Sequence, residues 1–115
     1  MIRILFSFLL VLHGVIHLMG FAKEWDLAPK GQLTGKTLID LSANTAKVLG
    51  LFWLLTCVML LGSTVLYLRH SMWFWIPVSA SLFISQLLII IYWHDAKFGT
   101  IVNVILLTFV LFSDV

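Results

Sequence analysis

Charged residues are scarce in this sequence. Asp, Glu, Lys and Arg make up 10% of the 115 residues, whereas soluble domains average about 25%. Hydrophobic residues reach 62%, so the chain has too few polar side chains to present a water-compatible surface. The composition therefore predicts an integral membrane protein. The net charge of +2, with basic residues scattered along the chain, argues against a nucleic-acid partner.

Cysteine is almost absent, and nucleophile motifs are not found. The single cysteine, Cys57, lies within an apolar run, which excludes an intrachain disulfide and favours a buried thiol that packs as a small hydrophobic group. The serines follow no nucleophile motif, and no glycine-rich loop could bind phosphate. The sequence therefore does not favour an enzymatic activity.

Apolar runs fill most of the chain. Because about 20 residues cross a bilayer as a helix, 115 residues accommodate four spans and no soluble domain. The runs predict one all-α membrane domain over 1–115, an antiparallel bundle of four transmembrane helices at approximately 2–22, 47–68, 72–93 and 96–115. Asp95 is expected to cap the N-terminus of the fourth helix.

Strong hydrogen-bonding groups recur at one predicted depth in three of these helices. The helical rise puts His17 about 7 Å and His13 about 13 Å below Ala22, and it puts Gln86 and Asn103 each about 10 Å below the same membrane surface. His13 and His17 are one turn apart, in line with Glu24 if the first helix continues past Ala22. We therefore predict a polar pocket that is lined by His13, His17, Gln86 and Asn103. The residues expected around its mouth are Glu24, His94, Asp95 and Lys97.

Three interpretations of this pocket stay open. In the first, the polar groups only bond one another and hold the helices together, as in a structural or assembly subunit. In the second, His13 and His17, at i and i+4, bind a metal ion; a haem fits less well, since its axial ligands come from opposite sides. In the third, the pocket binds a small polar or lipid-like ligand, or forms part of a proton-linked path. Binding of a small or lipid-like ligand is the function that we expect, although the sequence names no cofactor.

Two segments resemble a known family. HGVIHLMGFAK and WHDAKFGTIVNVI, which contain most of the pocket residues, are similar to motifs of small bacterial four-helix integral membrane proteins. That resemblance implies a four-helix bundle in the bacterial inner membrane and implies no activity. A looser likeness to the DoxX-type four-helix membrane proteins rests on size and number of spans. The expected surroundings are the lipid bilayer, with a homo-oligomer or a partner membrane protein left open.

Basic residues are unequally divided between the two predicted membrane surfaces. Five lysines lie at the surface that holds the first and third connecting segments, and only Arg3 and Arg69 lie at the other: Lys23, Lys30, Lys36, Lys47 and Lys97. The positive-inside rule then places the lysine-rich segments in the cytoplasm and both chain ends outside.

Overall fold

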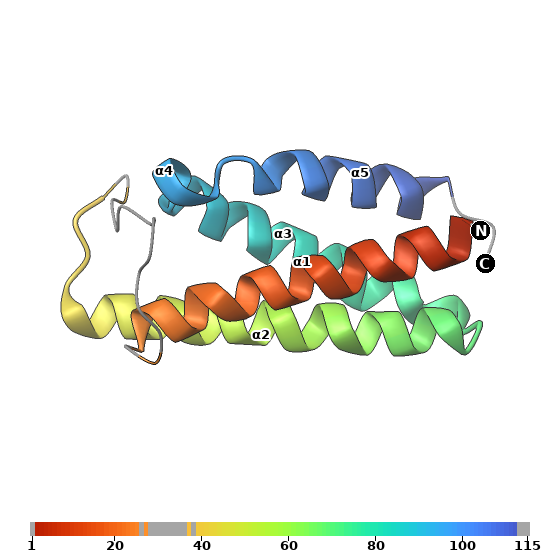
Figure 1. Cartoon of the computed structure of the whole chain (residues 1–115), viewed down its shortest axis with the longest axis horizontal. Helices are drawn as coiled ribbons and strands as arrows, with labels where there is room; N and C mark the ends of the chain where they lie inside the picture. Colours follow the sequence, from red (N-terminus) through yellow and green to blue (C-terminus); the bar gives the residue numbers. More distant parts are fainter. Residues whose placement is uncertain (1, 26, 28–36, 38, 113–115) are drawn as a thin grey trace.

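The computed structural model of the chain describes residues 2–25, 27, 37 and 39–112. Every regular element in these residues is helical, and the elements follow one another along the chain as α1 (Ile2–Glu24), α2 (Ala43–Leu68), the 3₁₀ turn η1 (Met72–Phe74), α3 (Trp75–Ile91), α4 (Trp93–Ala96) and α5 (Gly99–Leu111). The helices form a bundle whose neighbouring members run in opposite directions along its long axis (Figure 1). α1 ends, α2 begins and α4 lies at one end of this bundle, which we call the loop end.

Three segments of the described chain are long and apolar enough to cross a membrane: Arg3–Glu24, Ala43–Leu68 and Met72–Ile91. The bundle is 43 Å long, which matches the roughly 40–45 Å of a bilayer with its headgroups. Its outer surface carries large apolar side chains along all three segments, such as Phe8, Val58 and Phe83, each at least 59% exposed. Soluble proteins rarely expose so large an apolar surface to water, so this surface indicates a membrane protein.

The ends of the helices differ in places from those expected. α1 continues through Lys23 and Glu24, so these two residues belong to a span and not to the connecting segment. α2 begins four residues before Lys47, because Ser42 caps it by accepting a hydrogen bond from the Thr45 backbone N–H at 3.1 Å. The expected short turn between the second and third helices is present, and His70 occupies it with a φ of 58°.

The prediction that Asp95 caps the fourth helix is wrong. Asp95 lies inside the four-residue helix α4, and α5 begins at Gly99 with Phe98 in the cap position and no side-chain cap. Lys97 and Phe98 keep helical backbone angles between α4 and α5, so the chain passes from one helix to the next without a side-chain cap. The Asp95 carboxylate lies near Lys23 of α1 instead.

Two apolar clusters form the core. One fills the half of the bundle away from the loop end and includes Phe6, Leu60, Tyr67, Val78 and Leu106, all at most 2% exposed. The other lies toward the loop end and consists of Trp53, Leu88, Ile89 and Tyr92. The buried polar side chains of His13, His17, Ser85 and Asn103 lie between these clusters along the helices.

Candidate functional site

The centre of the candidate site is a hydrogen bond that joins α1 to α5. His13 Nε2 lies 2.6 Å from Asn103 Oδ1, and the two side chains are only 2% and 5% exposed. Because an amide oxygen can only accept, His13 Nε2 carries a proton and donates it. This bond fixes the tautomer of His13 and leaves its other ring nitrogen, Nδ1, without a proton in the neutral imidazole.

His17 continues the connection to α3. Its Nδ1 lies 2.7 Å from the His13 carbonyl oxygen, so Nδ1 donates. Its Nε2 lies 2.7 Å from Ser85 Oγ. A charged imidazole is costly among hydrocarbon, and in the neutral ring Nε2 accepts from the Ser85 hydroxyl. Both nitrogens of His17 are thus occupied by protein groups.

Asn103 connects the histidines to the rest of α3. Its amide nitrogen donates to Ser85 Oγ and to Gln86 Oε1, both at 3.1 Å. Gln86 in turn donates to Thr100 Oγ1 at 3.1 Å. These bonds join α1, α3 and α5 into one network, which we call the polar layer: His13, His17, Ser85, Gln86, Thr100 and Asn103.

Other hydroxyl groups in the spans behave differently. Thr56, Ser63, Thr64 and Ser81 each donate to a backbone carbonyl of their own helix, three or four residues earlier. Such bonds satisfy a hydroxyl without linking helices. The polar layer is therefore a distinct feature of the bundle and does not simply reflect its serine and threonine content.

One polar atom of the layer is left over. His13 Nδ1 is buried and has no hydrogen-bond partner among the described residues. With the proton fixed on Nε2, this atom is an acceptor whose lone pair receives no hydrogen bond from the described residues. An unsatisfied buried acceptor lowers stability by about 1–3 kcal/mol. His13 Nδ1 is the one buried polar atom of the layer that lacks a partner among the described residues.

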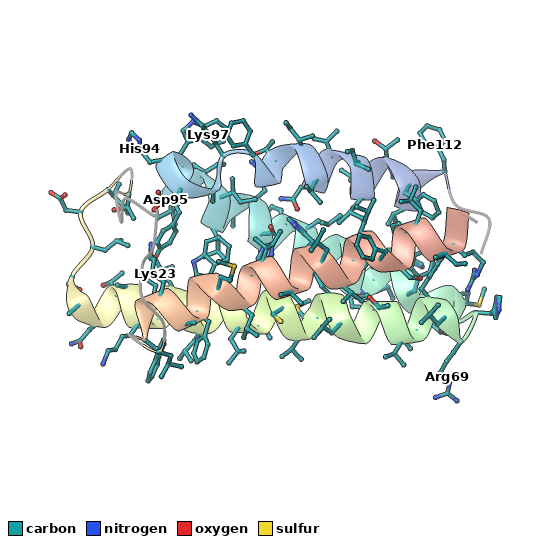
Figure 2. All side chains as sticks on the ribbon, in the orientation of Figure 1. Lys23, Arg69, His94, Asp95, Lys97 and Phe112 are labelled. Atoms are coloured by element: carbon teal, nitrogen blue, oxygen red, sulfur yellow. The ribbon has the colours of Figure 1, made fainter. Side chains whose placement is uncertain are left out.

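A second group of polar side chains lies at the loop end, above the layer. The Tyr92 hydroxyl donates to Glu24 Oε2 at 2.8 Å, and Lys23 Nζ lies 3.5 Å from Glu24 Oε1 and 3.9 Å from Asp95 Oδ2. Lys23 Nζ also lies 4.8 Å from the centre of the Tyr92 ring. Figure 2 shows Lys23 on α1 and Asp95 on α4 facing each other. We call Lys23, Glu24, Tyr92 and Asp95 the polar mouth.

A cavity of about 300 Å³ extends between the polar layer and the polar mouth. His13 and His17 line it toward the membrane centre, and Lys23 and Asp95 line it toward the loop end. Its remaining wall is apolar and includes Ile16, Met19, Trp53, Ile89 and Val102. Met19 and Phe98, which also line it, are 58% and 72% exposed, so the cavity opens sideways between α1 and the α4–α5 segment.

The predicted pocket residues divide into three groups in the structure. His13, His17 and Asp95 line the cavity; Gln86, Asn103 and Glu24 do not line it but bond to the layer or the mouth. His94 and Lys97 lie on the outer side of α4 (Figure 2) and are exposed. The expectation that these two residues surround the mouth is therefore not met. On a helix, residues one or two positions from Asp95 point to other sides.

Five polar or aromatic residues of the site were not among the predicted pocket residues: Ser85 and Thr100 of the polar layer, Lys23 and Tyr92 of the polar mouth, and the cavity-lining Trp53. Lys23 lies one residue beyond the end predicted for the first span, Ala22. The spacing of four and three residues from Ser85 to Ile89 and Tyr92 could have placed all three on one face of α3.

The hydrogen bonds of His13 and His17 affect whether these two residues can bind a metal ion. Within the residues that the structure describes, no group of three or more His, Cys, Asp or Glu side chains could hold a metal ion. Among the four ring nitrogens of His13 and His17, three take part in hydrogen bonds. A metal ion held by both imidazoles would have to replace at least one bond of His17.

Comparison with protein-family models, with curated proteins and with solved structures finds no match to this chain.

Proposed function

We propose that this chain is a multi-pass protein of the bacterial inner membrane that binds a small, lipid-like ligand between α1, α3 and the α4–α5 segment. The observation that carries the proposal is the cavity, which has apolar walls and polar groups at both of its ends. Ligand sites in proteins are typically apolar concavities with a few converging polar groups. The proposal includes no chemical step, so the chain acts as a binding component and not as an enzyme.

The dimensions of the cavity suit an amphiphile aligned with the helices. Lys23 and His13 are ten residues apart on α1, which corresponds to about 15 Å along the helix axis. A molecule between them would have one end at the membrane surface and the other near the membrane centre. The apolar wall formed by Ile16, Met19 and Val102 suits a hydrocarbon chain, and the polar mouth suits a headgroup.

The proposal treats α4 and α5 together as the fourth span. α5 alone has 13 residues, or about 20 Å of helix, which is shorter than the roughly 30 Å hydrocarbon core. The helical turn of α4 and the two residues that follow it extend this segment to the loop end, where Trp93 is 40% exposed at a position typical of interfacial aromatics. Four antiparallel spans then enclose the site, in line with the bacterial family that the two motifs resemble.

The surroundings of the bundle are part of the same proposal. Its exposed apolar side chains contact lipid, a second copy or a partner membrane protein. The cavity is formed within one chain, so ligand binding by the isolated protein is expected.

Filling the cavity tests this proposal. The protein is purified in a mild detergent, and co-purifying lipids are extracted and quantified per chain by mass spectrometry, for the wild type and for Val102→Phe. Val104→Phe is the matched control, because Val104 is on the same helix, is 57% exposed and does not line the cavity. We expect a lipid retained by the wild type and by Val104→Phe and lost from Val102→Phe. Equal lipid content in both variants would contradict the proposal.

A further inference from the structure

The distance between the Lys23 ammonium and the Asp95 carboxylate indicates what kind of headgroup fits the polar mouth. Lys23 Nζ and Asp95 Oδ2 are 3.9 Å apart, and their side chains are only 6% and 9% exposed. Both residues line the cavity. This distance exceeds the roughly 2.7–3.2 Å of a direct N–H···O bond. An ammonium and a carboxylate with little access to water offset the cost of their burial best when they are in direct contact.

One oxygen atom fits between these two groups. An atom about 2.8 Å from both, a normal hydrogen-bond distance, completes a triangle with the observed 3.9 Å side and an angle near 90° at that atom. A hydroxyl oxygen in this position accepts a hydrogen bond from Lys23 and donates one to Asp95. A carboxylate has about four lone-pair positions, so Asp95 accepts this bond in addition to its other interactions.

The charges around the position select among headgroups. An anionic headgroup would approach Lys23 but would also meet the carboxylates of Glu24 and Asp95, which are 3.5 and 3.9 Å from Nζ. A cationic headgroup would meet the Lys23 ammonium. Like charges at such distances disfavour binding where water is scarce. A neutral hydroxyl avoids both repulsions.

We infer that the ligand is a neutral amphiphile with a hydroxyl headgroup, such as a long-chain alcohol or a monoacylglycerol. Its hydroxyl bridges Lys23 and Asp95, and its hydrocarbon chain extends along Ile16, Ile89 and Val102 toward the polar layer. This inference rests on the proposed function and adds the class of ligand to it.

Three probes with the same oleyl-length chain test the headgroup: monoolein, oleic acid and oleylamine. Each is titrated into delipidated wild-type protein in detergent, and its dissociation constant is measured by native mass spectrometry. A hydrogen bond to a charged group contributes about 1.5–3 kcal/mol, or roughly 10- to 150-fold in affinity. We therefore expect monoolein to bind at least about tenfold more tightly than the acid or the amine.

Variants then locate the headgroup. Lys23→Met is expected to weaken monoolein binding about tenfold, by loss of one hydrogen bond to a charged donor. Lys97→Met removes an exposed ammonium two residues from Asp95 and is expected to leave the affinity unchanged. The comparison of probes on the wild type stays decisive if Lys23→Met does not fold.

The outcomes separate the two proposals. Tighter binding of oleic acid or oleylamine, sensitive to Val102→Phe, would overturn the neutral headgroup and keep the lipid-binding function. Equal binding of all three probes would mean that only water occupies the position between Lys23 and Asp95, which also overturns the headgroup assignment. No binding of any probe, together with no co-purifying lipid, would overturn the proposed function itself.

Discussion

His13 and Asn103 are 90 positions apart in the sequence and form a 2.6 Å hydrogen bond in the interior of the bundle. This bond joins the first helix to the last one and fixes which nitrogen of His13 carries a proton. Through Asn103 it also links the histidines to Ser85 and Gln86 on α3. The polar layer therefore links three of the helices that surround the cavity.

The coupling between His13 and Asn103 is measurable. Asn103→Leu is expected to lower the free energy of unfolding by about 1–2 kcal/mol, because it leaves the His13 N–H unsatisfied in an apolar interior. In His13→Leu/Asn103→Leu both partners are apolar, so the loss is expected to be smaller than the sum of the single losses. Unfolding in mixed micelles of increasing SDS fraction provides these values.

The control for this cycle is Thr108→Val, because Thr108 is exposed and its hydroxyl donates to the Val104 carbonyl of its own helix. Its effect should stay within about 0.5 kcal/mol, as for other surface substitutions. Strictly additive losses at His13 and Asn103 would mean that the bond does not contribute to stability.

Two glycines provide a matched test of packing against Trp53. A Cβ atom at Gly20 would lie 2.5 Å from the Trp53 ring, so Gly20→Ala forces α1 or the indole to move. Overpacking of this kind typically costs about 1–3 kcal/mol. A Cβ at Gly62 meets no atom within 4 Å, so Gly62→Ala should leave stability unchanged or raise it by up to about 1 kcal/mol. The same SDS unfolding assay compares them, and equal losses would contradict the packing argument.

The metal content of the protein is expected to be below one ion per chain. His17 uses both ring nitrogens in hydrogen bonds. Of the four ring nitrogens of His13 and His17, Nδ1 of His13 is the one without a partner among the described residues. Elemental analysis and an absorption spectrum of the purified protein check this expectation. A stoichiometric metal ion or chromophore that disappears in His13→Ala/His17→Ala would instead support the metal hypothesis.

The distribution of lysine and arginine predicts the orientation in the membrane. Lys23 and Lys97 lie at the loop end, and Arg69 lies at the opposite end (Figure 2). Lys47 is near the start of α2 at the loop end, and Arg3 is near the start of α1 at the other end. The positive-inside rule places the loop end in the cytoplasm. A reporter enzyme that is active only outside the cytoplasm, fused after residue 115, should therefore be active. Activity of a cytoplasm-specific reporter at the same position would reverse the orientation.

Helical periodicity and depth predicted that His13, His17, Gln86 and Asn103 approach one another, and the structure brings them into one network. Rise per residue sets depth, so polar residues at a common depth meet wherever their helices pack. The role of Ser85 was not predictable in the same way. A serine in a span usually bonds to its own helix, as Ser81 does. Ser85 differs from Ser81 because His17 and Asn103 lie opposite it on neighbouring helices.

The polar mouth was harder to predict for a different reason. Lys23 was assigned to the connecting segment because the first helix was expected to end at Ala22, one residue earlier. The two additional helical residues place Lys23 and Glu24 beside Tyr92 and Asp95. The ends of a helix fray and are the part of it that sequence pattern predicts least reliably, so a site built at such an end is not readily visible in one sequence.

The sideways opening of the cavity, between Met19 on α1 and Phe98 beside α5, has a consequence for the lipid-binding function proposed above. Under that proposal, a molecule dissolved in the bilayer reaches His13 and Lys23 by lateral diffusion and never has to leave the bilayer. Occupancy then depends on the mole fraction of the ligand among the surrounding lipids and not on its concentration in water. Dilution of the sample with buffer would leave the complex intact, whereas dilution with additional lipid or detergent would dissociate it.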